Sequence, residues 1–412
     1  MYKIISGGGK MMRYEEKKQG RICIFLAYML CFTGIVSSLG AIFNDLLPGI
    51  SFNIGLLYIL YFILLTWVIV DNCAKVSGST ILIVLVITAL FLSVLVFHSQ
   101  NMKYMWTTAS DLLENPTYIF VFYALIGYFV SRRLKNITVF ISILEKFAVF
   151  TVMVLAFRFF VGVIFKSTVP EYMTFSYNLL FPTTFLLLFS IRDFKWYRVV
   201  TAILGSVLIF IAGCRGALLS LIISTLLYVF FFGKIPRKNK YRVTAVFMIL
   251  LIIVVFFYEP ILVLLNGKLS GIGINSRTIA MLLTSTFSDD SGRENIIEHV
   301  VKNFNVFGYG LWGDRVLLNG MYAHNMVIEL LCDFGLIVGS ILLVVFISIL
   351  VKGLKYSDEQ MSVILCALVS VGVIKLLFSG SFLNQEPGVY VLIGLCINSI
   401  KDFVREQRLR EK

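Results

Sequence analysis

The sequence has 412 residues, of which 59% are hydrophobic and only 14% are charged, and its mean hydropathy is +0.91. Soluble proteins of this length carry far more charge, so the composition excludes a water-soluble globular protein. A net charge of +13 would suggest nucleic acid as the partner of a soluble domain. Here the basic residues lie in short segments between apolar runs, where the inner face of a membrane explains them better. We therefore expect an all-α integral membrane protein that contacts membrane lipids and no nucleic acid.

Apolar runs of roughly 16–24 residues predict about 12 transmembrane helices, because about 20 apolar residues cross the hydrocarbon core of a bilayer. In chain order they are expected at 22–43, 52–70, 79–97, 117–131, 138–165, 174–191, 198–213, 216–232, 242–264, 325–351, 361–379 and 387–400. The first run is too long for the apolar part of a signal peptide, so it should be retained. The alternation of basic and nearly uncharged connections places both termini in the cytoplasm.

One connection differs from the others, because residues 265–324 are polar, Gly-rich and long. The helix count puts this loop outside the cell, between the ninth and tenth helices, and a loop of about sixty residues is usually functional. The sequence thus divides into helices at 1–264, the extracytoplasmic loop at 265–324, and helices with a basic cytoplasmic tail at 325–412. The stretch Asn295 to Phe304 is amphipathic, and the outer segment 98–116 is expected to cover the loop.

The three histidines are His98, His299 and His324, and all fall on the predicted outer side. His324 lies in Tyr322-Ala-His-Asn325, where the long loop re-enters the membrane. An imidazole that titrates near neutral pH suits a general base that deprotonates a sugar hydroxyl. A helix cap or an interfacial residue is the alternative for His324, and we expect His98 and His299 to be interfacial and surface residues.

Two arginines are candidates for binding an anion. Arg215 lies in a turn, Gly213-Cys-Arg-Gly216, just before a predicted helix, where free N–H groups and the helix dipole add to its positive field. Arg293 precedes the amphipathic stretch, and its planar fork matches phosphate oxygens. Arg277 is a weaker candidate of the same kind. The alternatives are snorkelling of Arg215 to the surface and an exposed loop charge at Arg293.

Arg158 and Lys375 lie within apolar runs, in the predicted outer half of the bilayer. Charges at that depth face a cavity, an anion or a carboxylate partner. Glu329 and Asp333 are one helical turn apart, so they either orient His324 or pair with one of these two cations.

No metal or cofactor site is expected. None of the seven cysteines forms a CxxC pair, and they are expected to be small buried hydrophobic residues. The acidic group Asp289, Asp290 and Glu294 is expected to be solvated rather than metal-bound. The sequence contains no Walker A motif and no GxSxG motif.

The motifs Ser291-Gly-Arg293, Val306-Phe-Gly-Tyr-Gly310, Ala323-His-Asn325 and Asp333-Phe-Gly335 form one ordered series. This series resembles the bacterial O-antigen polymerase and O-antigen ligase family, which includes exopolysaccharide and capsule repeat-unit polymerases. The family also has an Arg-Gly turn before helix eight, as at Cys214-Arg-Gly216, and a Glu is common where this chain has Asp333. The resemblance covers roughly residues 205–340.

The resemblance implies a metal-independent glycosyltransferase in the bacterial plasma membrane. Arg215 and Arg293 would bind the diphosphate of the lipid-linked donor, and His324 would activate the acceptor hydroxyl or position the diphosphate. The further substrate-binding candidates are Arg158, Arg277, Tyr309, Asn325, Asp333 and Lys375. The expected partners are undecaprenyl-diphosphate-linked oligosaccharides, membrane lipids, a chain-length regulator and a flippase.

We expect a polymerase that moves a growing glycan from undecaprenyl diphosphate to a lipid-linked repeat unit at the outer face. A ligase that uses a different acceptor is the nearest alternative. A lipid-linked oligosaccharide flippase is less favoured, because the chain lacks paired halves and its unusual charges lie toward one side. A non-enzymatic membrane scaffold is the remaining alternative.

Overall fold

All secondary structure in the described residues is helical, as the sequence predicts. The computed structural model describes residues 5–46, 55–72, 78–105, 117, 120–166, 171–235, 240–241, 244–245, 260, 262–268, 270–271, 277–284, 293–383 and 387–411. Seven helices in these ranges are long and apolar enough to cross a membrane, or eight if the bent pair Ile81–Phe97 and Ser99–Met105 is one span. The chain is therefore a multi-pass membrane protein.

The count of seven or eight is lower than the predicted dozen for identifiable reasons. The apolar cores at Ile59–Val70 in α2 (Gly55–Asn72) and at Trp196–Ala212, which is α9, are helical but short. The run predicted at 117–131 forms a π-helix, η4 (Phe120–Ala124), followed by α6 (Leu125–Ser131). The predicted helix at 242–264 lies largely outside the described residues.

The chain forms two compact units, and unit 1 comprises Met1–Trp67, Lys135–Asp289 and Asp358–Ser370. Besides α9 and most of α2, its described helices are α1 (Ile5–Leu46), α7 (Ile137–Val161), η5 (Gly162–Lys166), α8 (Tyr172–Arg192), α10 (Arg215–Leu227), η6 (Tyr228–Phe232), α12 (Arg277–Leu283) and α16 (Glu359–Val369). α7 packs against α1 and α8, and α8 also contacts α9, α10 and α16. Gly205 of α9 allows close approach to α8, because a β-carbon there would lie 3.0 Å from Thr183 Cγ2.

A buried ion pair joins the helices of unit 1. The Arg198 side chain is 2% exposed, and its Nε and Nη2 donate to the two carboxylate oxygens of Glu145 at 2.5 and 3.0 Å. Its Nη1 donates to Asp193 Oδ2 at 2.8 Å, and its guanidinium lies 3.9 Å from the centroid of the Phe189 ring. This arginine, which the charge pattern alone treats as a solvated loop residue, links α7 to the end of α8 and to α9.

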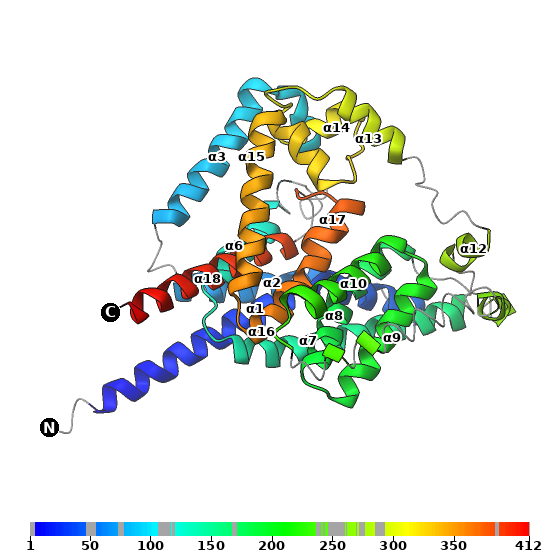
Figure 1. Ribbon diagram of the computed structural model, residues 1–412, viewed down its shortest axis with the longest axis horizontal. Coiled ribbons are helices and arrows are strands. Elements are labelled where there is room, and N and C mark those ends of the chain that lie inside the picture. Colours follow the sequence, from blue (N-terminus) through cyan, green and yellow to red (C-terminus); the bar gives the residue numbers. More distant parts are fainter. Residues whose placement is uncertain are drawn as a thin grey trace. The chain divides into compact units, whose positions relative to one another are not determined.

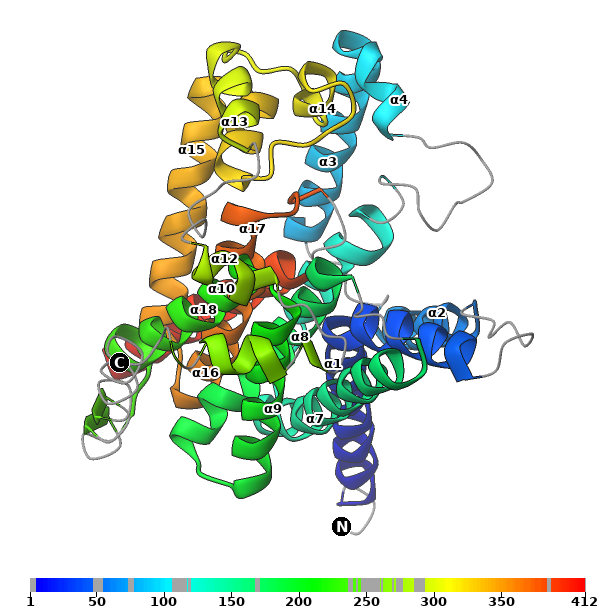
Figure 2. The same ribbon diagram turned by 90° about the vertical axis from the view of Figure 1, so that its right-hand side faces the viewer.

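Unit 2 comprises Val68–Leu134, Asp290–Ser357 and Val371–Lys412. Besides η4 and α6, its helices are α3 (Gly78–Phe97), η2 (Ser99–Asn101), α4 (Met102–Met105), α13 (Arg293–Lys302), α14 (Gly313–Leu317), α15 (Met326–Tyr356), α17 (Lys375–Phe378) and α18 (Pro387–Arg410). α18 packs against α6 and α15, while α13 and α14 pack against α15. Figures 1 and 2 both show α13 and α14 beside the amino-terminal end of α15.

α13 covers most of the stretch that the sequence predicts to be amphipathic, and it does have two different faces. Val300 is fully buried on one face with Ile296 packed near it, while Glu298 and Lys302 form an exposed ion pair on the other. The part of α15 that follows Gly335 exposes apolar side chains, such as Ile337, Ile341 and Val344. Those exposed apolar residues are suited to contact lipid.

Candidate functional site

α15 is interrupted at Gly335, where the backbone has φ 76° and ψ 170° instead of helical values. The interruption frees carbonyl groups, and the segment 305–310 binds them. The N–H groups of Tyr309 and Gly310 donate to the carbonyls of Cys332 and Asp333, both at 2.9 Å, and Leu336 N–H donates to the Asn305 carbonyl at 3.0 Å. The loop and the broken helix therefore satisfy each other's main-chain groups.

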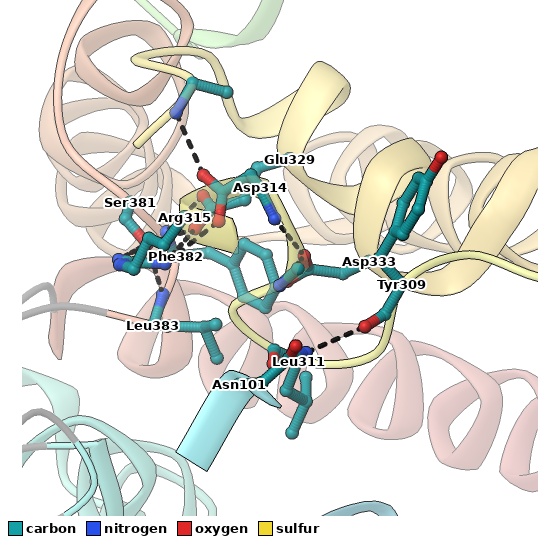
Figure 3. Close-up of polar contacts among 12 residues, drawn as sticks. Asn101, Tyr309, Leu311, Asp314, Arg315, Glu329, Asp333, Ser381, Phe382 and Leu383 are labelled. Carbon is teal, nitrogen blue, oxygen red and sulfur yellow. Dashed lines mark hydrogen bonds and ion pairs between the residues drawn. The ribbon is translucent and has the colours of Figure 1, made fainter. Parts of the chain in front are cut away.

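A buried asparagine holds the next part of the loop. Asn101, which is 0% exposed, donates through Nδ2 to the carbonyls of Tyr309 and Leu311 at 2.7 and 2.9 Å (Figure 3). Trp312 follows in the left-handed region at φ 62°, fully buried against a cluster that includes Met105. The bend between α3 and α4 thus supplies the residues that fix the loop before α14.

Three buried carboxylates gather around one arginine where α14 meets α15. Asp314, Glu329 and Asp333 offer oxygens that lie within 4.8 Å of one another. Arg315 Nη1 lies 3.1 Å from Asp314 Oδ1 and 3.5 Å from Glu329 Oε1 (Figure 3). Asp333 Oδ1 accepts from the Gly313 and Asp314 N–H groups at 3.0 and 3.4 Å. These four residues are called the acid–arginine cluster below.

The acid–arginine cluster has more negative than positive groups. Three ionised carboxylates would exceed the single guanidinium, and burial opposes such an excess. Burial raises the pKa of Asp314, and the Arg315 charge opposes this rise. The oxygens are close enough to hold a metal ion, but Arg315 already supplies a cation between Asp314 and Glu329. The cluster ties α14 to α15 through these contacts.

His324 lies directly after a residue that the acid–arginine cluster holds. The Ala323 N–H donates to Asp314 Oδ2 at 2.9 Å, and His324 itself has a left-handed backbone with φ 55°. Its ring lies 3.9 Å from the Tyr322 ring, centroid to centroid. Burial lowers the pKa of His324 to about 4, and the positive charge of Arg293 acts in the same direction. The imidazole is thus neutral at pH 7, which is the form that can accept a proton.

Arg293 and Asn325 bind neighbouring carbonyls at the end of α17. Arg293 Nη1 donates to the Phe378 carbonyl at 2.6 Å, and Asn325 Nδ2 donates to the Leu377 carbonyl at 3.1 Å. Asn325 Oδ1 also caps α15 by accepting from the N–H groups of residues 327 and 328. Among the described residues, nothing accepts a hydrogen bond from Arg293 Nε or Nη2. These two donors remain available to an anion.

The other predicted site residues have the following positions. Arg215 is the first residue of α10, and Arg158 lies in α7 with a buried Nη1 that has no hydrogen-bond partner among the described residues. Arg277 begins α12, but its side chain lies outside the described residues. Lys375 begins α17, and the Tyr309 hydroxyl donates to the Asn303 carbonyl at 2.6 Å. The three arginines at 158, 215 and 277 belong to unit 1. Arg293, His324 and Asn325 all belong to unit 2.

The sequence reasoning missed the partner of the buried acids. Of the two alternatives for Glu329, the ion pair with Arg158 or Lys375 is wrong, because its ion pair is with Arg315, whereas an effect on the orientation of His324 stays a prediction. The neighbouring Asp314 and the turn residue Ser381 were also missed. No signal in the sequence marks Arg315, since charged residues in a polar loop normally indicate solvated charges. Of the other two histidines, His98 packs its ring against Gly310, and His299 is exposed as a surface residue.

Comparisons with known proteins identify one segment of the chain. Residues 200–344 match a family model described as O-antigen ligase. This segment is about a third of the chain and contains Arg215, Arg293 and His324. No curated protein and no solved structure matches the chain. The resemblance seen in the motifs is thereby confirmed: this multi-pass membrane protein carries an O-antigen ligase family domain at residues 200–344, of the type that transfers glycans in polysaccharide biosynthesis.

Proposed function

We propose that the protein is a polysaccharide polymerase that moves a growing glycan from undecaprenyl diphosphate onto a lipid-linked repeat unit. The observation that supports this most directly is the location of Arg293 near His324, since Arg293 and Asn325 bind neighbouring carbonyls. The guanidinium has two donors without a described protein partner, and burial together with the Arg293 charge lowers the pKa of the imidazole. An anion-binding fork beside a neutral base is what transfer from a diphosphate-linked sugar requires.

The proposed reaction is a displacement at the anomeric carbon of the donor sugar. A hydroxyl oxygen of the acceptor repeat forms the new bond to that carbon, while the bond from the carbon to the diphosphate oxygen breaks. The hydroxyl proton passes to a nitrogen of His324, and Arg293 stabilises the charge on the departing diphosphate. Inversion at the anomeric carbon follows from this single displacement, and the proposal takes the arginines, rather than a metal ion, to neutralise the departing diphosphate.

Arg215 is proposed as a second phosphate ligand, because it lies at the amino-terminal end of α10. Arg158, Arg277, Tyr309, Asn325, Asp333 and Lys375 stay predictions as substrate-binding residues. For Asn325 and Asp333 the hydrogen bonds within the protein favour an indirect contribution, through the positions of Arg293 and the loop.

The arrangement in the membrane is also part of the proposal. About 12 spans, an extracytoplasmic segment at 265–324 between the parts 1–264 and 325–412, and cytoplasmic termini agree with the distribution of Lys and Arg. The location is the bacterial plasma membrane. A flippase would supply the lipid-linked repeat at the outer face, and a chain-length regulator would limit the number of transfers.

The test is chain extension by the purified protein, reconstituted with a defined lipid-linked repeat. We expect a ladder of products, and we expect Arg293→Ala and Arg215→Ala each to abolish it while the protein stays folded in the membrane. Lys at either position should restore activity only in part, because a point charge lacks the fork. Lys302→Ala, which removes an exposed cation from α13, is the matched control. Normal ladders from both alanine variants would refute the proposal.

The match to a model described as O-antigen ligase favours a second candidate, a ligase that moves the glycan to a different acceptor. Product analysis separates the two functions. A polymerase converts single lipid-linked repeats into longer ones without any other acceptor, whereas a ligase needs the second acceptor and makes no ladder. A flippase would differ from both, since its inactive variant leaves repeats in the inner leaflet.

A further inference from the structure

The segment from Leu377 to Leu383 forms hydrogen bonds with residues of both the acid–arginine cluster and the Arg293 region, and it is called the 377–383 turn below. At its start, the carbonyls of residues 377 and 378 accept hydrogen bonds from Asn325 and Arg293. Gly380 reverses the chain with φ 90°, which a residue with a β-carbon adopts only with strain. The turn therefore carries the main-chain groups that fix the Arg293 side chain.

Glu329 holds the other end of the 377–383 turn. The Ser381 hydroxyl donates to Glu329 Oε1, and the Phe382 N–H donates to Glu329 Oε2 at 3.2 Å (Figure 3). Arg315 Nη2 donates to Ser381 Oγ at 3.2 Å, and Arg315 Nη1 lies 3.5 Å from Glu329 Oε1. Glu329 is 1% exposed and Ser381 is 0% exposed, so water does not compete for these bonds.

The preceding helix does not by itself fix the course of the turn. α17 is the last turn of the helical span Glu359–Phe378, and the carbonyls at the end of a helix have no partner within it, so the residues that follow need other contacts. The Phe378 carbonyl that binds Arg293 lies only three residues before Ser381. A shift of Ser381 and Phe382 would thus move the carbonyl on which the Arg293 fork depends.

We propose that Glu329 is a positioning residue for Arg293: it fixes the 377–383 turn, and the turn holds the guanidinium where it meets the diphosphate. This inference rests on the proposed function, because it takes Arg293 as the ligand of the lipid-linked diphosphate. Glu329 does not touch the substrate, and its effect reaches the substrate through the hydrogen bonds of Ser381, Phe382 and Phe378.

The experiment is a double-mutant cycle on the full-length protein in lipid nanodiscs, with undecaprenyl diphosphate as the probe and its Kd as the readout. We expect Glu329→Ala to weaken binding by roughly tenfold, as is typical for residues in one contact network. In the Arg293→Ala background, we expect Glu329→Ala to have no further effect. Glu329→Gln keeps one acceptor oxygen and should restore part of the affinity. A variant that only loosened the fold would not show this dependence on Arg293.

If Glu329→Ala does not fold, Ser381→Ala takes its place in the cycle, because it removes the hydroxyl that donates a hydrogen bond to Glu329. Glu298→Gln is the matched control, because it removes a carboxylate from exposed α13. Equal effects of Glu329→Ala with and without Arg293, or no effect of Glu329→Ala or Ser381→Ala, would overturn the positioning role. Unchanged affinity in Arg293→Ala itself would instead overturn the proposed function.

Discussion

Two features of its surroundings keep the His324 imidazole neutral. Its Nδ1 is buried without a hydrogen-bond partner among the described residues, and its neighbour Arg293 carries a positive charge. Both conditions disfavour the imidazolium form. The free imidazole is a weaker base than an ordinary histidine, but it is present at any physiological pH. The approach of a diphosphate would neutralise Arg293 and make the imidazole more basic at the moment when a proton has to be accepted.

We predict that His324 stays unprotonated down to about pH 4. Burial and the Arg293 charge lower its pKa to about 4, against an ordinary value of 6.5. The measurement is the rate of acylation of His324 by diethyl pyrocarbonate as a function of pH, quantified at this site by mass spectrometry. The rate should fall only near pH 4, and in Arg293→Ala the midpoint should move upward. A midpoint near 6.5 in the unmodified protein would contradict the prediction.

The same shift has a consequence for stability, with a definite sign. Between about pH 4 and 6.5 the unfolded chain binds more protons at His324 than the folded chain does. The contribution of this residue to stability is therefore fully present above pH 6.5 and decreases as the pH falls through that window.

The sequence alone singles out His324 and Arg293 but not their surroundings. The sequence shows a histidine and an arginine in a predicted outer loop, and the order of the motifs that contain them resembles a known family. Arg315 and Asp314 escaped because an Asp-Arg dipeptide in a loop normally indicates solvated charges. Only the fold shows that these two are 6% and 0% exposed and face Glu329.

At the scale of elements, the interruption of α15 at Gly335 organises the site. A β-carbon there would lie 2.6 Å from both the Gly308 nitrogen and the Phe307 carbonyl carbon, so main chain packs directly on main chain. Gly308 faces Gly335 in the same way, with Phe334 C at 2.7 Å from its added β-carbon. The sequence motif Asp333-Phe-Gly335 thus corresponds to a helix break that a hydropathy profile cannot reveal, because the apolar run continues through it.

We predict that Gly335→Ala destabilises the protein by at least about 2 kcal/mol, from the left-handed backbone together with the collision with the loop main chain. Thermal unfolding in detergent, followed by light scattering and intrinsic fluorescence, measures the effect. Gly20→Ala is the control, since nothing lies within 4 Å of the added β-carbon in that helix. Equal melting temperatures for the two variants would contradict this prediction.

Helix existence was predictable for most elements, whereas helix pairing was not. The apolar runs correspond to α1, α3, α7, α8, α10, α15, α16 and α18, because run length is set by bilayer thickness. The Arg198–Glu145 ion pair was not foreseen, since Glu145 and Arg198 are far apart in sequence and each reads as an inner-surface charge. Tertiary pairing of this kind depends on how α7 and α9 pack, and hydropathy carries no information about that.

At the scale of the whole molecule, the proposed function requires that the loop with His324 and Arg293 lie on the outer side of the membrane, where the proposed substrate is. The Phe307 side chain, in the segment 305–310, is 91% exposed, and Glu411, near the carboxyl-terminal end of the chain, is exposed too. Each is therefore a suitable position for an accessibility label.

We predict that Phe307→Cys, in a cysteine-free background, reacts with a membrane-impermeant maleimide in intact cells. Glu411→Cys should react only after the cells are permeabilised, because basic segments stay in the cytoplasm. Labelling is measured as a gel shift with a polymer-linked maleimide. Reaction of position 307 only after permeabilisation would place the loop in the cytosol and would rule out transfer at the outer face.

The main-chain hydrogen bonds between residues 305–310 and α15 leave most side chains of this segment free to vary in sequence. Hydrogen bonds between N–H and C=O groups do not depend on which side chains the loop carries, as long as the glycines remain. Mutations that alter the loop's outward side chains can therefore accumulate without loss of its backbone course. On the proposed function, such a scaffold can change its preference among sugars while it keeps His324 and Arg293 in place.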